Sequence, residues 1–290
     1  MLKVRKISDF GSGTPAVARL GPGVVELLKF SKIPKESQDR VASCTWDVLQ
    51  ILVPAQRLAK EVIAELDAIE ERLRRDGIVF ENFGRVVEVP SAMKLDKVAD
   101  FIVRAKRVLV RAMELIHLFW GEKLAAAYYH KAVAWAREEL GEEAPLTRML
   151  DDDQAWIKHI IDLRNEEEHP SKGPFVRNYD VNVHEDGRVE LVVPHLYDGT
   201  NVRDALTVFS EDLLTFVEEL VALGVMHTFS WPQQLAIAEI PVAERDPKLP
   251  VRFRVTLNDE AARNFAAATR ANARATATVS EDRGDRGEKE

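Results

Sequence analysis

The sequence predicts a mainly α-helical fold, a helical bundle that carries two small β-hairpins and a C-terminal arm of strands. Three observations support this fold class. Apolar residues recur at helical spacing over five long segments, with glycine or proline between most of them. Two shorter segments alternate apolar and polar residues on either side of turn-forming residues. The 290 residues are 46% hydrophobic and 30% charged, a composition typical of a globular protein with a core of its own.

The chain is expected to begin with an irregular lead over residues 1–37, in which GSGTP, GPG and KIPKES place Gly and Pro at short intervals. Within it, VVELLKF predicts a short helix. GSGTP is not a phosphate-binding loop, because no GK[ST] follows it. The first long helix is predicted over 40–75, with Pro54 kinking or dividing it and Asp76-Gly77 ending it.

The next segments predict a hairpin and three helices. IVFENFGRVVEVP has short alternating runs on either side of residues 82–84, as a hairpin does. Helices are predicted over 93–120 and 122–140, and their short connection predicts that they are antiparallel neighbours. A fourth helix is expected to start at the acidic run 151–153, because carboxylates suit a helix N-terminus. It ends in LRNEEEHP, residues 163–170.

The remaining segments complete a bundle domain over 38–230 and an arm over 231–257. YDVNVHEDGRVELVVPHL predicts a second hairpin that turns at Glu185-Asp186-Gly187. A fifth helix is predicted over 201–225, and LAIAEIPVAE and VRFRVTL predict isolated strands in the arm. The tail over 258–290 lacks apolar residues to bury, so we expect it to be disordered or a frayed helix.

Composition also excludes several classes of function. No run of about 18 apolar residues predicts a membrane span, and the N-terminus lacks the apolar region of a secretory signal, so we expect a cytoplasmic protein without a membrane partner. The single cysteine, Cys44, excludes an internal disulfide and a CxxC zinc finger. The sequence contains no GxSxG motif, the signature of many serine hydrolases.

One local basic patch stands out on this acidic chain. The net charge of -8 argues against a surface that coats nucleic acid, since phosphate binding depends on Lys and Arg. Four cations nonetheless recur at i, i+7, i+10 and i+14, which places them on one helix face. We interpret them as a candidate RNA-binding stripe, with a solvated helix face as the alternative. They are Lys97, Arg104, Arg107 and Arg111.

The stretch LRNEEEHP combines an unfavourable local charge with groups that can cleave RNA. Acids in the last turn of a helix are unfavourable by roughly 0.3–1 kcal/mol each. The stability of the helix therefore does not explain the three glutamates. The imidazole of His169 can take a 2′-hydroxyl proton near neutral pH. The guanidinium of Arg164 can hold a phosphate and its developing charge, and Asn165 can orient either group.

The arrangement Arg164-Asn165-x-x-x-His169 at a helix end resembles the motif of the HEPN superfamily. The resemblance covers about residues 40–226. It implies a helical, usually dimeric, metal-independent endoribonuclease without cofactor, acting on RNA in a toxin-antitoxin, defence or stress role, with a possible cognate antitoxin protein. The catalytic residues would be Arg164, Asn165 and His169, and Glu114 is a candidate for an additional polar residue. Many members are inert RNA- or protein-binding modules, which is the first alternative.

Two further interpretations use the same residues. In one, LRNEEEHP is a solvated helix end with an i, i+4 ion pair between Arg164 and Glu168. In the other, Glu166-x-x-His169 joins Glu114-x-x-His117 in a di-iron site, because paired Glu-x-x-His motifs on different helices are the core of such sites. The second interpretation requires both motifs to lie at the same end of the bundle.

Overall fold

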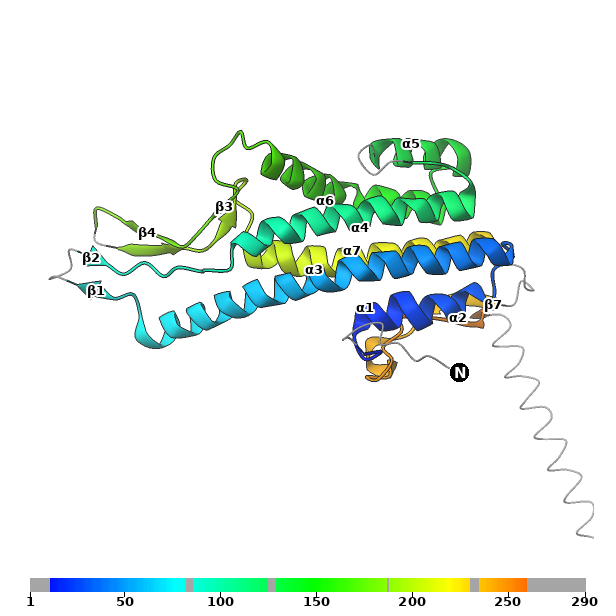
Figure 1. The fold of residues 1–290 in the computed structure, drawn as a ribbon, viewed down its shortest axis with the longest axis horizontal. Helices are drawn as coiled ribbons and strands as arrows, with labels where there is room; N and C mark the ends of the chain where they lie inside the picture. The colour runs from blue at the N-terminus through cyan, green and yellow to red at the C-terminus, as the bar shows by residue number, and fades with distance from the viewer. Residues whose placement is uncertain (1–10, 82–85, 125–128, 187, 230–234, 260–290) are drawn as a thin grey trace, which may run out of the picture.

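The computed structural model describes residues 11–81, 86–124, 129–186, 188–229 and 235–259, and within these ranges the protein is mainly helical. Four long helices form a bundle (Figure 1): α3 (Lys35–Asp76), α4 (Asp96–Trp120), α6 (Pro145–Glu168) and α7 (Val202–His227). A shorter helix, α5 (Tyr129–Leu140), packs against α6 at one end. None of the described helices is long and apolar enough to cross a membrane.

The four long helices alternate in direction around the bundle. Ion pairs between α3 and α4 join Asp47 to Arg111 and Glu61 to Lys97, so these helices are antiparallel. Helix α7 is antiparallel to α3, because Gln56 donates to the carbonyl of Ser210 and Asp67 pairs with Arg203. It is also antiparallel to α6: the ring of Trp156 contacts Phe216, and that of His159 contacts Phe209.

Helix α5 does not lie where the sequence places it. Residues 121–124 are not helical, and the prediction for 125–128 lies outside the described residues. The hydroxyl of Thr147 in α6 donates to the carbonyl of Ala136 in α5 over 3.1 Å, and Arg137 pairs with Asp151. Thus α5 packs on α6, and α6 takes the expected place of α5 as the antiparallel neighbour of α4.

The start of α6 also differs from the prediction. The helix begins at Pro145, six residues before the acidic run that was expected to start it. Proline suits the first helical position, because its missing N–H would have no partner there. Leu146 and Leu150 are buried in the core, so burial of an apolar face extends the helix to this point.

Pro54 does not divide α3, which is one helix of 42 residues. Proline inside a helix leaves the carbonyl four residues earlier without its partner, at a cost of about 3 kcal/mol. That carbonyl belongs to Gln50, which lies on the exposed side of α3. Leu52 and Ala55 are completely buried on the other side. Core packing therefore maintains the helix through a residue that disfavours it.

Helices α4 and α7 approach closely at Gly224, because its missing side chain leaves room for Phe119. A Cβ on Gly224 would lie 2.2 Å from Cδ2 of Phe119. The ring of Phe119 stands edge-on to Trp120, which in turn stacks on His227. Glycine within a helix costs about 1 kcal/mol relative to alanine. The close contact with Phe119 explains why a glycine nevertheless occupies this position of α7.

Small antiparallel sheets occupy the connections between helices. The first predicted hairpin is present as β1 (Phe80–Glu81) paired with β2 (Val86–Val87). The second is present as β4 (Asp180–Val183) paired with β5 (Val189–Val192), and β3 (Val176–Arg177) pairs with β6 (His195–Leu196) at its base. The strands expected to be isolated pair with each other, β7 (Leu235–Glu239) with β8 (Phe253–Leu257). Of the predicted disordered tail, residues 260–290 lie outside the described residues.

The N-terminal stretch is more helical than its Gly and Pro content predicts. Three consecutive segments, α1 (Pro15–Ala18), the π-helical η1 (Arg19–Gly23) and α2 (Val24–Leu28), contain the predicted short helix and extend it. Leu20, Val24 and Leu27 belong to the same core as the bundle helices. Burial of these side chains compensates for Pro22 and the glycines beside it.

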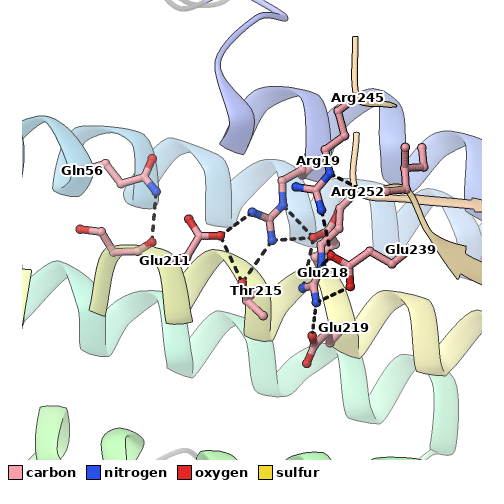
Figure 2. A network of polar contacts seen from close by, with 11 residues as sticks. Arg19, Gln56, Glu211, Thr215, Glu218, Glu219, Glu239, Arg245 and Arg252 are labelled. Carbon is pink, nitrogen blue, oxygen red and sulfur yellow. Dashed lines mark hydrogen bonds and ion pairs between the residues drawn. The ribbon is translucent and has the colours of Figure 1, made fainter. Parts of the chain in front are cut away.

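A buried network of charges joins the N-terminal segment and the β7–β8 hairpin to α7 (Figure 2). Arg19 Nε donates to Glu218 Oε2 over 2.7 Å, and its Nη1 donates to Glu211 Oε1 over 2.8 Å. Arg252, directly before β8, lies 3.8 Å from Glu218 and 3.1 Å from Glu239. The N-terminal segment and the β7–β8 hairpin are therefore held on α7 by oppositely charged groups.

Candidate functional site

The motif Arg164-Asn165-x-x-x-His169 forms the last turn of α6. The helix ends at Glu168, and the N–H of His169 donates to the carbonyl of Asn165 over 2.9 Å. His169 has left the helical conformation, with φ -130° and ψ 68°. Pro170 causes this, because a proline disfavours the helical region at the residue before it. The predicted helix end is confirmed.

The three predicted catalytic residues differ in exposure and in partners. The side chain of His169 is 84% exposed, and Asn165 is exposed as well. Arg164 is 25% exposed and forms an ion pair with Glu168, the i, i+4 pair that the sequence allows. Nε2 of His169 lies 4.0 Å from Oε2 of Glu168, so this carboxylate stands between the guanidinium and the imidazole.

Glu166 has a structural role that spacing alone does not reveal. It is buried, and it accepts hydrogen bonds from the Ser171 hydroxyl over 2.9 Å and from the Lys172 N–H over 2.6 Å. A bond from the Ser171 N–H is the largest cause of the lowered pKa of Glu166. The acid thus holds the turn that follows the helix. In the sequence, this role of Glu166 is indicated only by Ser171 and Lys172, which follow it by five and six residues.

A further cation, Lys106 of α4, is near enough to Arg164 for their charges to interact. Burial lowers the pKa of the Lys106 amine, and the charge of Arg164 lowers it further. Two like charges at this junction of α4 and α6 favour an anionic ligand, since an anion relieves their repulsion. The sequence offers no reason to single out Lys106, because Arg164, the residue with which its charge interacts, belongs to another helix.

Only the two ends of the predicted RNA-binding stripe on α4 pair with carboxylates of α3. Lys97 pairs with Glu61, and Arg111 is held between Asp47 and Glu114. Two members, Arg104 and Arg107, make no ion pair within the part of the chain that the structure describes. The ends of the stripe therefore face α3, whereas Lys106 and Arg164 lie between α4 and α6.

The two Glu-x-x-His motifs lie at opposite ends of the bundle. Trp120, at the end of α4, lines one cavity with Pro145 at the start of α6, while Lys106 is near Arg164. Helices α4 and α6 are therefore antiparallel, with His117 near one end and His169 at the other. Nδ1 of His117 is hydrogen-bonded to the carbonyl of Gly121 at 3.0 Å. In the described ranges no three His, Cys, Asp or Glu side chains are grouped to hold a metal ion. The geometry that a di-iron site requires is thus absent.

Comparison of the chain with family models, with curated proteins and with solved structures gave no match. The interpretation of the site consequently depends on its own residues and geometry.

Proposed function

We propose that this protein is a metal-independent endoribonuclease of the HEPN type, acting in a toxin-antitoxin, defence or stress response. One observation carries the proposal. Arg164, Asn165 and His169 meet in one accessible helical turn, and Lys106 of the neighbouring helix adds a second cation near them. This turn offers a proton acceptor and an anion site within a few ångströms of each other, as general-base cleavage of RNA requires.

The chemistry needs no cofactor. The 2′-hydroxyl of RNA transfers its proton to the imidazole of His169, and its oxygen bonds to the adjacent phosphorus. The bond from phosphorus to the 5′-oxygen breaks, and that oxygen takes up a proton, which leaves a 2′,3′-cyclic phosphate and a 5′-hydroxyl. Arg164 stabilises the charge that develops on the phosphate.

The ion pair with Glu168 does not prevent Arg164 from binding phosphate. A helical i, i+4 pair of this exposure stabilises by about 0.3–0.5 kcal/mol. A charge-assisted hydrogen bond to a phosphate is worth about 1.5–3 kcal/mol, so the exchange of partners is favourable. Glu168 then acts as a weak competitor that moderates RNA affinity. Removal of this carboxylate by Glu168→Gln should raise RNA affinity about twofold.

A homodimer would complete the site. One imidazole cannot serve both the attacking and the leaving oxygen at once, and a two-fold axis would bring a second copy of the motif. Light scattering should therefore report a dimer, and mixing inactive His169→Ala chains with inactive Arg164→Ala chains should restore part of the cleavage. A monomer at micromolar concentration would contradict the shared site.

The decisive experiment is RNA cleavage in EDTA. We expect cleavage products with 2′,3′-cyclic phosphate ends, and we expect His169→Ala and Arg164→Ala to abolish cleavage without a change in the circular dichroism spectrum. His184→Ala, which removes a histidine from the β4–β5 hairpin, is the matched control and should leave the rate unchanged. Cleavage that persists in both motif variants refutes the proposal. Motif-dependent RNA binding without cleavage supports the inert RNA-binding module instead.

A further inference from the structure

A second site lies at the other end of α4, away from the motif. A cavity of about 510 Å³ opens between the N-terminal part of α3 and the C-terminal part of α4. Its volume is within the range of about 300–1,000 Å³ that is common for pockets that bind small molecules. Its lining includes Arg40, Cys44, Met113, Glu114, His117 and Lys123.

The charges around the cavity favour an anion. Arg111 is held by Asp47 and Glu114, so these three groups neutralise one another in part. Arg40 and Lys123 are exposed and make no ion pair with any residue that the structure describes. Within the described residues, these two cations at the rim thus have no carboxylate partner, on a chain whose net charge is -8. An arginine and a lysine that line the same cavity suit a doubly charged phosphate group.

The floor of the cavity is apolar. Met113 and Cys44 are 2% and 4% exposed, and Leu118 and Leu124 are half-buried beside them. The thiol of Cys44 donates to the carbonyl of Arg111 over 3.3 Å, and burial raises its pKa to about 12. A thiol in this state is not a nucleophile near neutral pH, so the floor offers packing surface and no covalent chemistry.

We infer that this cavity binds a small phosphate monoester, whose phosphate lies between Arg40 and Lys123 and whose apolar or ring-shaped body packs on Met113 and Leu118. Ser43 adds a hydroxyl at the rim, and the carboxylate of Glu114 can accept a hydrogen bond from a donor on the ligand. The His117 ring also lines the cavity, and its Nδ1 is hydrogen-bonded to the carbonyl of Gly121. The site does not depend on the proposed nuclease activity.

Phenyl phosphate and inorganic phosphate are the probes, measured by calorimetry and by the methyl resonance of Met113 in protein labelled at its methionines. Phenyl phosphate should bind several-fold more tightly than inorganic phosphate and should shift the Met113 resonance. Arg40→Gln and Lys123→Gln should each weaken its binding about tenfold, because each removes a charged hydrogen bond. Lys60→Gln, which removes an exposed lysine about 30 Å along α3, should leave binding unchanged.

Three results would overturn the inference. They are no binding of phenyl phosphate at millimolar concentration, equal affinity for the two phosphates, or equal weakening by Lys60→Gln. A further variant separates this site from the nuclease motif. His169→Ala should retain full phenyl phosphate affinity, so binding here can succeed where RNA cleavage fails.

Discussion

Removal of Glu218 tests whether the N-terminal segment and the β7–β8 hairpin are integral to the bundle. The Arg19–Glu218 pair is nearly inaccessible, with the two side chains 4% and 3% exposed. The same arginine also binds Glu211, whose side chain is 65% exposed. One guanidinium therefore has a buried and an exposed carboxylate partner, and Glu211→Ala is a matched control for Glu218→Ala.

The expected magnitudes follow from this difference in exposure. Breaking a buried ion pair costs about 3–5 kcal/mol, because the remaining charge is buried without compensation. In Glu218→Ala, Arg19 keeps Glu211 at 2.8 Å, so we expect the lower end, about 3 kcal/mol. An exposed pair contributes about 0–1 kcal/mol, which is the loss expected for Glu211→Ala. The double variant Arg19→Met, Glu218→Met should recover most of the stability, because no buried charge remains unpaired and Arg252 still has Glu239.

Urea unfolding followed by circular dichroism measures the free energy of unfolding, and hydrogen exchange of residues 15–28 and 235–257 reports local release of these two segments. Glu218→Ala should lower the free energy of unfolding and should raise hydrogen exchange in both segments. Losses for Glu218→Ala and Glu211→Ala that agree within about 0.5 kcal/mol would refute the reasoning, since burial would then make no difference.

Two other variants test packing and titration. Gly224→Ala should destabilise the protein by about 1–3 kcal/mol in urea unfolding, because the new Cβ meets Phe119, whereas Gly21→Ala, with open space around it, should be neutral or mildly stabilising. Burial raises the pKa of Asp153 to about 6, so its contribution to stability is greatest below about pH 4 and is lost as pH rises through 6. Asp153→Asn keeps an acceptor for Trp156 and should gain stability relative to the original protein between pH 4 and 7; a constant difference would contradict the assignment.

The helical elements were largely predictable because each buries a face of its own. Apolar spacing located the long helices. The fifth begins one residue after its predicted start, at Val202, and the side chain of Asn201 accepts from the N–H groups of Arg203 and Asp204. The errors occur where tertiary packing outweighs local preference. Pro54 lies within α3 because its neighbours are buried, and α6 starts at Pro145 because the turns before the acidic run are in the core.

The surroundings of the candidate site were less predictable than its residues. Sequence spacing placed Arg164 and His169 in one turn, since both belong to one helix. It did not identify Lys106, because which face of α4 meets α6 depends on the bundle. Nor did it identify Glu166 as the acid that binds the following turn, since the conformation of residues 169–172 decides which carboxylate reaches their N–H groups.

The direction of α6 distinguishes between two chemistries that share His169. In one, the partner of the histidine is Arg164, one helical turn away, so the geometry is local and is unaffected by how the bundle is assembled. In the other, the partner is the Glu114–His117 motif on α4, which α6 would have to meet with the same end. Because α5 packs on α6 and α6 is antiparallel to α4, the two motifs are separated along the bundle. The local pair remains, and the acids around it make separate contacts: Glu166 accepts the hydrogen bonds that hold the turn, while Glu168 pairs with Arg164.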